Sequence, residues 1–354
     1  MGAPLVSVVI VVCNFEHYLG EAIESIVKQS FTGFELIVLD FGSTDRSKQI
    51  AAGFAATDSR IRLHEIPNCS LVEARNAGCS LAQGKYIAVM DADDVSLSNR
   101  LQGEVDFIDQ HPLVGLVGGA AEWIDATGRS MWVLNFSASD QEIKEALLTH
   151  FPFCHSAVLM RRELFRRVGG YRPVFTASHD YDLCLRISEQ TQCANLPQIV
   201  VKYRVHGSQV SLSKRKQQTF CKLAAQVSAS SRKSGNPDPL NSVQEITPEL
   251  LLRLGVSEAS QQADLASDYQ RWIQSMSMAG EASVALKATE EALHSNWKFV
   301  GRNQIADLNF TAARLYWKQK HFFKGMVSTI RAVILQPVLA KRLVGPVLRR
   351  LHLV

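Results

Sequence analysis

Apolar and polar residues alternate along the first 90 residues in blocks of two kinds. Short apolar runs predict strands at residues 5–12, 34–39, 61–65 and 85–90. Between them, apolar residues repeating with a helical period predict helices near 19–28, 44–55 and 71–82. Strands that alternate with helices in this way are typical of a parallel sheet covered on both faces. We therefore predict a doubly wound α/β sheet that binds ligands at the carboxyl ends of its strands.

The pattern changes after about residue 213. Residues 229–247 are rich in Ser, Asn and Pro, which is typical of a linker or surface loop. From Leu250 onwards the apolar spacing is helical. We predict three regions: an α/β domain over 1–213, a helical or linker segment over 214–260, and an all-α region over 261–354.

Two stretches of the helical region, 264–296 and 305–337, each have the pattern of a pair of helices. They resemble the helical hairpins of tetratricopeptide repeats. Two imperfect copies are a weak signal, because three or more repeats are normally needed for a stable array.

The composition is that of a folded protein. The chain has 354 residues, of which 46% are hydrophobic, and this excludes wholesale disorder. No stretch reaches the ~18 uncharged apolar residues of a membrane-spanning helix. The apolar start, Met1 to Phe15, lacks a basic end and predicts a buried strand, not a signal peptide. Seven cysteines without a C-x-x-C pair favour free thiols in a reducing compartment.

Three polar clusters follow the apolar segments. They comprise residues 40–45 after the second predicted strand, 91–94 after the fourth, and 179–182 at the start of a helical pattern. The first two lie where a doubly wound sheet binds its ligands. Neither G-x-G-x-x-G nor G-x-x-x-x-G-K-S/T occurs in the N-terminal part, so dinucleotide-binding and P-loop functions lack motif support.

Asp91 and Asp93 flank one small residue directly after a strand. Carboxylates placed in this way can share a hard divalent cation such as Mg²⁺ or Mn²⁺, with water or phosphate completing its shell. The alternative is an ordinary Asp-rich turn, because Asp tolerates tight turns. The further acidic clusters at 40–45 and 179–182 favour a binding site.

These clusters belong to longer stretches that resemble glycosyltransferase family 2. In chain order the matching stretches are Ser7–Phe15, Glu35–Asp45, Ala74–Gly78, Gly84–Asp94, Gly169–Tyr171, His179–Leu183 and Tyr203–Gly207. Together they span about residues 4–213, and their order and spacing make the resemblance specific. It implies a GT-A fold, followed here by the helical region, and transfer of a sugar from a nucleotide-diphosphate donor with inversion at the anomeric carbon.

The resemblance also implies a donor site. By position in the motifs, Asp40 would contact the nucleoside base, Arg75 would lie near the base or diphosphate, and Asp91 would face the ribose. Asp93 would bind Mn²⁺ or Mg²⁺ between the two phosphates, and His206 would complete the metal or diphosphate site. UDP is the family's usual nucleotide, with GDP and dTDP as alternatives.

In the same way, the resemblance assigns Asp180 as the catalytic base. A single displacement at the anomeric carbon needs one base within hydrogen-bond reach of the acceptor hydroxyl. The leaving nucleoside diphosphate gains negative charge, which a metal ion stabilises as a Lewis acid. The expected acceptor is a hydroxyl of a glycan or a lipid-linked sugar.

Two residues depart from the family's pattern, and two more have open roles. Phe41 stands where a second Asp is usual, and His179 stands where a Glu usually precedes the base. His155 is either a residue near the acceptor or a hydrogen-bonded core histidine. Trp123 is either part of an acceptor wall or an ordinary core or surface residue.

The net charge of +4 hides an asymmetry. Residues 308–354 contain nine Lys and Arg and no Asp or Glu, whereas the rest of the chain has 29 Lys and Arg against 34 Asp and Glu. Short amphipathic pieces in the basic tail, residues 338–354, favour peripheral association with an anionic membrane surface. Binding of a partner protein, or closure of the helical region, are the alternatives. No aromatic–basic nucleic-acid motif occurs, so we expect no nucleic-acid partner.

The hypothesis from the sequence is a metal-dependent inverting glycosyltransferase of cell-surface polysaccharide synthesis, in the cytoplasm or at the inner face of the cytoplasmic membrane. A nucleotidyltransferase is a competing class, but its Gly-rich N-terminal loop is missing. A non-enzymatic alternative is a nucleotide-sugar-binding scaffold that acts through its helical region. Phe41 and His179 are its only support.

Overall fold

The computed structural model describes residues 3–207, 209 and 214–340. Contacts divide the chain into two units, Met1–Arg204 with Cys221–Ile246, and Val205–Phe220 with Thr247–Val354. Each unit is described by itself. The three-region division at residues 213 and 260 stays a prediction.

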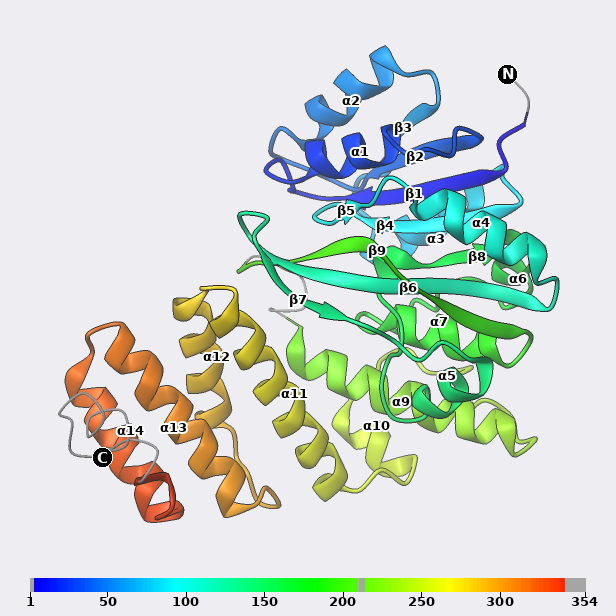
Figure 1. Ribbon diagram of the computed structural model, residues 1–354. Coiled ribbons are helices and arrows are strands. Elements are labelled where there is room, and N and C mark those ends of the chain that lie inside the picture. Colours follow the sequence, from blue (N-terminus) through cyan, green and yellow to red (C-terminus); the bar gives the residue numbers. More distant parts are fainter. Residues whose placement is uncertain (1–2, 208, 210–213, 341–354) are drawn as a thin grey trace. The chain divides into compact units, whose positions relative to one another are not determined.

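The first unit is built on one mixed sheet with the strand order β3-β2-β1-β4-β8-β6-β9-β5, and β7 pairs with β6 (Figure 1). Strands β3, β2, β1 and β4 are parallel, and β8 and β6 continue the sheet with antiparallel pairs. The strands are β1 Val6–Val12, β2 Phe34–Asp40, β3 Ile61–Glu65, β4 Tyr86–Asp91, β5 Val95–Ser96, β6 Val114–Asp125, β7 Ser130–Leu134, β8 Leu159–Arg161 and β9 Gln192–Val205.

Every residue of β1 and β2 is buried, so the centre of the sheet is covered on both faces. The helices of the α/β region are α1 Leu19–Val27, α2 Ser47–Thr57, α3 Leu71–Leu81, α4 Arg100–Gln110, α5 Asp140–Ala146, α6 Arg162–Arg167 and α7 His179–Ser188. The chain order reverses at β1, because β2 and β3 lie on one side of it and β4 on the other. This is the position at which an open α/β sheet binds ligands.

The polypeptide is helical beyond the sheet, as its sequence predicts. Helix α9, Arg215–Lys233, contributes residues to both units. It is followed by α10 Pro248–Arg253, α11 Glu258–Met278, α12 Ala282–His294, α13 Arg302–Lys318 and α14 Phe322–Leu335. From α11 to α14, each helix packs on the next, so the two predicted helical pairs are present (Figure 1). No helix in the described part of the chain is long and apolar enough to cross a membrane.

Candidate functional site

Asp40 is the last residue of β2, and its two carboxylate oxygens differ in their hydrogen bonds. Its Oδ1 accepts hydrogen bonds from the backbone N–H groups of Gly42 (2.9 Å) and Ser43 (2.8 Å). Gly42 has a φ of +122°, a conformation that glycine adopts without strain. The Oδ2 atom is buried and has no hydrogen-bond partner. Since buried carboxylate oxygens are rarely left unsatisfied, this atom is suited to a donor group of a ligand.

The loop after β1 is joined to the loop after β2. Asn14, which has a φ of +63°, accepts a hydrogen bond from the backbone of Thr44 (2.7 Å) through Oδ1, and its own N–H donates to the Ser43 hydroxyl (3.1 Å). Because these contacts hold the chain in a turn, α2 begins at Ser47 and not near residue 44 as predicted. The two loops therefore form one rigid rim beside Asp40.

Arg75, on α3, pairs with Asp91 at the end of β4. Its Nη2 donates to Asp91 Oδ1 (2.6 Å), and its Nη1 lies 3.3 Å from His155 Nδ1. Helix α3 comes close to β1 at Gly78, where an added Cβ would lie only 2.7 Å from Val9. The Nε atom of Arg75 is buried without a hydrogen-bond partner. The side chain is thus fixed in place with one donor unused.

The attraction between Arg75 and Asp91 keeps both side chains ionised although both are largely buried. Burial opposes both charges, but the attraction of Arg75, followed by the contact with His155, lowers the pKa of Asp91. In the same way, Asp91, with smaller effects of Tyr171 and Asp180, raises the pKa of Arg75. Both groups therefore stay charged. The contribution of Asp180 also places its carboxylate within electrostatic reach of Arg75.

The loop that carries Asp93 and Asp94 is held by Arg204. The backbone N–H of Arg204 donates to Asp94 Oδ1 (2.8 Å), and its Nε donates to the carbonyl of Asp93 (2.8 Å). The same guanidinium donates to Glu21 on α1 (2.6 Å). Asp93 is partly exposed, whereas Asp94 is buried. Burial and the charges of Asp93 and Asp91 raise the pKa of Asp94, so this residue acts as an anchor.

His155 is a hydrogen-bonded histidine beside the Arg75–Asp91 pair, and its role near the acceptor stays a prediction. Its Nε2 lies 3.1 Å from the Tyr171 hydroxyl, while its Nδ1 faces Arg75. The rings of His155 and Tyr171 each make an edge contact with the ring of His179. The unusual His179 is thus part of a buried aromatic cluster that joins the Arg75–Asp91 pair to α7. Trp123 instead stacks between Trp132 and Tyr203.

Asp180 lies in the first turn of α7 and is partly exposed. Its Oδ1 accepts a hydrogen bond from the backbone N–H of Tyr181 (2.9 Å). The preceding Ser178 has a φ of +50°, a strained conformation for a residue other than glycine. The chain therefore turns sharply into α7 and presents this carboxylate at the start of the helix.

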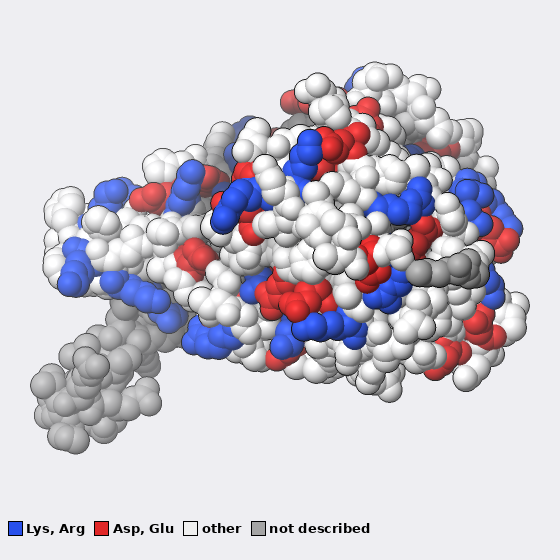
Figure 2. Space-filling view, turned by 90° about the horizontal axis from the view of Figure 1, so that it is seen from above, with Lys and Arg blue, Asp and Glu red and all other residues white. Residues whose placement is uncertain are grey.

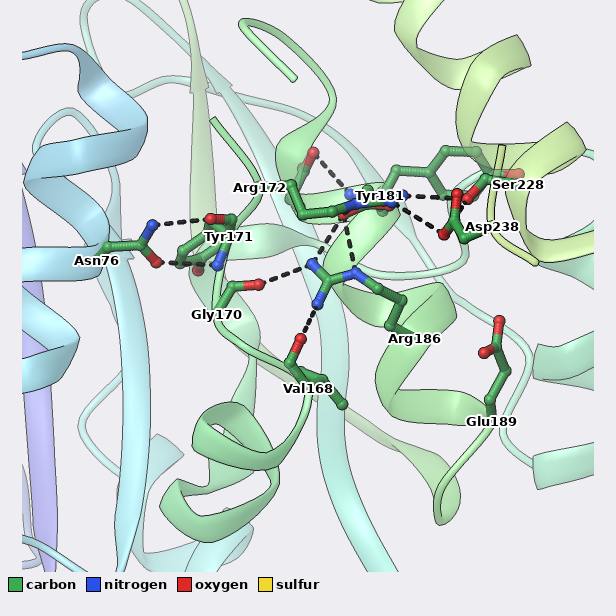
Figure 3. A network of polar contacts seen from close by, with 12 residues as sticks. Asn76, Val168, Gly170, Tyr171, Arg172, Tyr181, Arg186, Glu189, Ser228 and Asp238 are labelled. Carbon is green, nitrogen blue, oxygen red and sulfur yellow. Dashed lines mark hydrogen bonds and ion pairs between the residues drawn. The ribbon is translucent and has the colours of Figure 1, made fainter. Parts of the chain in front are cut away.

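Helix α7 is held by a mostly buried set of polar residues that we call the clamp: Arg172, Asp182 and Arg186, with Asp238 and Ser228 (all but Asp182 are labelled in Figure 3). Arg172 and Arg186 both bind the Asp182 carboxylate. Arg186 also donates to the carbonyls of Val168 (2.6 Å) and Gly170 (2.7 Å), and Arg172 reaches Asp238 (2.9 Å). Asn76, the residue after Arg75, binds both backbone groups of Tyr171 (Figure 3). The clamp was not predicted from the sequence.

The predicted metal ligands can be tested for fit. Among the described residues, no three His, Cys, Asp or Glu side chains lie together as a metal cluster. Asp91 is engaged by Arg75 and Asp94 is buried, whereas Asp93 is partly exposed. Mg²⁺ is commonly held by one or two carboxylates plus substrate phosphates, and a single Asp93 fits this mode. His206 is buried and belongs to the second unit, so its part in the site stays a prediction.

The chain is similar in sequence to known glycosyltransferases. The pattern of Glycosyl transferase family 2 matches residues 7–169. A putative glycosyltransferase of Bacillus subtilis, EpsE, is 38% identical over 192 residues, which are 53% of this chain and 68% of EpsE. An uncharacterized glycosyltransferase of Haemophilus influenzae is 28% identical over 221 residues, 59% of this chain and 68% of that protein.

Two solved structures share the fold. A mannosyltransferase from Pyrobaculum calidifontis, in complex with GDP-Man and Mn²⁺, has a TM-score of 0.51 at 18% identity, covering 94% of this chain and 87% of that one. Residues 1–349 of S. aureus TarS, in complex with UDP-GlcNAc, have a TM-score of 0.51 at 17% identity, covering 94% and 92%. The sheet and its helices are thus a GT-A fold followed by a helical region. Together with the similarity to EpsE, this shows that the chain is a glycosyltransferase and belongs to glycosyltransferase family 2.

Proposed function

We propose that the chain transfers a sugar, with inversion, from a nucleotide-diphosphate donor to a hydroxyl of a glycan or lipid-linked acceptor. The observation that carries this proposal is the placement of Asp40 and of the Arg75–Asp91 pair. They lie at the ends of β2 and β4, which flank β1 at the reversal of strand order. A nucleotide bound across β1 would meet both.

In this proposal each strand end recognises one part of the donor. Asp40 offers its buried Oδ2 to an N–H of the nucleoside base. Asp91 faces the ribose, and Arg75, held by Asp91, keeps its positive charge next to the diphosphate. Fixed charges of this kind stabilise the negative charge that develops on the leaving group without reorganising during the reaction.

Asp180 acts as the base. Inversion by one displacement requires a single carboxylate that removes the proton of the acceptor hydroxyl as its oxygen attacks the anomeric carbon. Asp180 is partly exposed at the first turn of α7, whereas its neighbour Asp182 is fully buried in the clamp. The exposed carboxylate is the one that an acceptor could reach.

A divalent cation, Mn²⁺ or Mg²⁺, would be held by Asp93 and the donor's phosphates, and we keep His206 as its proposed second protein ligand. When bound, such a cation supplies Lewis-acid stabilisation of the leaving diphosphate. Arg204 holds the backbone of Asp93 and thereby keeps the carboxylate at the end of β4.

The biological setting belongs to the same proposal. We place the reaction in cell-surface polysaccharide synthesis, in the cytoplasm or at the inner face of the cytoplasmic membrane. The predicted membrane contact of the basic tail, residues 338–354, falls mainly on residues outside the described part of the chain. We propose UDP as the nucleotide and keep GDP as the main alternative.

A donor-hydrolysis screen tests the proposal. The full chain is incubated with UDP-, GDP- and dTDP-sugars, with Mn²⁺ or with EDTA, and the released nucleoside diphosphate is measured. We expect turnover of one donor class, which EDTA and Asp93→Ala both abolish. Asp58→Asn, a control whose carboxylate binds Arg60 outside the proposed site, should not abolish it. Metal-dependent donor binding with no hydrolysis and no transfer to any acceptor would favour the scaffold alternative.

A further inference from the structure

Helix α14 carries a row of exposed apolar side chains. Its members recur mainly every fourth residue, continue past the end of the helix, and are Phe322, Phe323, Met326, Ile330, Ile334 and Val338. Phe323 is 74% exposed and Ile334 is 67% exposed. Single exposed apolar residues are ordinary, but a continuous row of large ones marks an interaction surface. We call this row the apolar stripe.

The stripe is not needed to hold α14 in place. The helix packs on α13 through its other face, where Gly325, Ser328 and Ala332 are buried. At the start of the helix, Phe322 packs against the exposed Trp317, whose Nε1 donates to the Thr329 hydroxyl (3.4 Å). The stripe therefore remains on the surface after the helical pair has formed its core.

The exposed charges that α14 and the turn before it carry are all positive. Lys318, at the end of α13, Lys320, in the turn before α14, and Arg331, on α14, are exposed. Lys324 of α14 is also exposed, and its ammonium group forms an ion pair with Glu290 of α12 (3.7 Å). No Asp or Glu occurs from Leu308 to the end of the sequence. In the space-filling view, Lys and Arg lie on the surface of the helical unit together with uncharged side chains and some Asp and Glu (Figure 2).

We propose that the apolar stripe of α14 lies in the plane of an anionic lipid bilayer. A bilayer surface offers acyl chains for the apolar side chains and negative headgroups for the flanking cations, which is the combination that interfacial helices use. Trp317 and the two phenylalanines are of the aromatic types that such helices carry on their apolar face. The helix lies on the membrane and does not cross it.

Charge argues against the two other occupants. A second copy of the chain, paired through its own α14, would bring Lys318, Lys320 and Arg331 next to their equivalents. The last 14 residues of this chain contain four more Lys and Arg and no acid, so they too would meet like charge. Only an anionic partner is complementary to the whole surface. The inference is independent of the proposed function, which would stand if it failed.

Vesicle co-sedimentation of the full chain tests the proposal. The vesicles are pure phosphatidylcholine or a mixture with phosphatidylglycerol. We expect binding to the mixed vesicles that high salt weakens, since headgroup attraction is screened. The triple variant Phe323→Ser, Ile330→Ser, Ile334→Ser should reduce the partition coefficient by about tenfold or more, because three anchoring side chains are lost. Replacing Lys318, Lys320 and Arg331 by Gln should remove most of the preference for phosphatidylglycerol.

A matched control carries three serines at exposed apolar positions of the first unit, Leu113, Val133 and Leu148, and should bind as the wild type does. Thermal unfolding and the oligomeric state are measured for every variant. Failure of the wild type to bind either vesicle would overturn the proposal, as would equal binding of the stripe variant. A wild-type dimer that the stripe variant turns into a monomer, without lipid binding, would show that α14 pairs with a second copy.

Discussion

Two arginine clusters of the first unit differ in whether all their buried polar atoms have hydrogen-bond partners. In the clamp, both oxygens of Asp182 and all three nitrogens of Arg186 have hydrogen-bond partners. In the cluster around Arg75, the Nε of that arginine is buried with no acceptor. At the end of β2, the Oδ2 atom of Asp40 is also buried and has no hydrogen-bond partner.

The difference separates structural from functional charge. A buried polar atom without a partner costs about 1–3 kcal/mol, so a cluster that only stabilises the fold is expected to satisfy its atoms. The clamp does so, and it holds the helix on which Asp180 stands. Arg75 Nε and Asp40 Oδ2 have no hydrogen-bond partner in the protein, and a bound ligand could supply one.

The largest expected effect is on activity. Asp180→Asn should lower the rate of sugar transfer by about a thousandfold, because a positioned base contributes about 10²–10⁴ and the amide cannot accept the proton. Its thermal stability should match the wild type, since Asp180 is partly exposed and takes no part in the clamp. Steady-state kinetics and thermal unfolding check both statements. Near-normal transfer by this variant would mean that another group is the base.

The neighbouring carboxylate should show the opposite behaviour. Asp182→Asn leaves the buried Arg186 without a counter-charge, while Arg172 keeps Asp238, and it should lower the free energy of unfolding by about 3–5 kcal/mol. Urea unfolding, with Asp180→Asn as the matched control two residues away, measures this. If the two variants were equally stable, the clamp would not be the element that holds α7.

Glu104 is another residue with a buried carboxylate oxygen that has no hydrogen-bond partner, and it lies in the core. This residue pairs with Arg100 in the core, and its Oε2 is buried without a partner. Burial, opposed by the attraction of Arg100, raises the pKa of Glu104 to about 7. The folded protein keeps a proton that the unfolded chain loses above its ordinary pKa of 4.5. Stability from this group is therefore full below pH 4.5 and is lost as the pH rises through about 7.

The loss amounts to about 3 kcal/mol at most, taking ~1.4 kcal/mol for each pKa unit. Glu104→Gln, which mimics the protonated form, should remove this part of the pH dependence. Urea unfolding of both proteins between pH 5 and pH 8 measures it. A slope that is the same in wild type and variant would contradict the shifted pKa.

The smallest effect is expected for the nucleoside contact. Asp40→Asn keeps an oxygen for the backbone of Gly42 and Ser43 but replaces the unused Oδ2 by an NH₂ group. The KM for the donor should rise by about tenfold, equivalent to about 1.4 kcal/mol, with little change in kcat. Asp58→Asn, whose carboxylate only binds Arg60, serves as control. An unchanged KM would remove Asp40 from the donor site.

Local patterns were enough to predict strands β1 to β4, the helical region and the strand-end carboxylates, but not strands β5 to β9. Burial of β1 and β2 on both faces makes their sequences almost continuously apolar, and the polar residue that ends each run is then visible. The predicted start of α2 was wrong by about three residues, because Asn14, 30 positions before Thr44, holds that turn.

The supports of the site could not be found from local patterns. Arg204 holds the Asp93–Asp94 loop from 110 positions away, and Arg172 reaches Asp238 across 66 positions. Arg204 lies in a stretch that resembles the family, but nothing in the local sequence indicates which groups Arg204 or Arg172 contacts. Only folding decides whether such an arginine meets solvent or a buried carboxylate.

The central claim is that separate carboxylates bind the donor and activate the acceptor. Calorimetric titration, with Mn²⁺ present, of the nucleoside diphosphate from the donor that the screen identifies tests this most directly. Asp180→Asn should bind it with the wild-type Kd while its transfer is lost, and Asp40→Asn should bind it about tenfold more weakly. Loss of nucleotide binding in Asp180→Asn, or wild-type binding in Asp40→Asn, would contradict the division of roles.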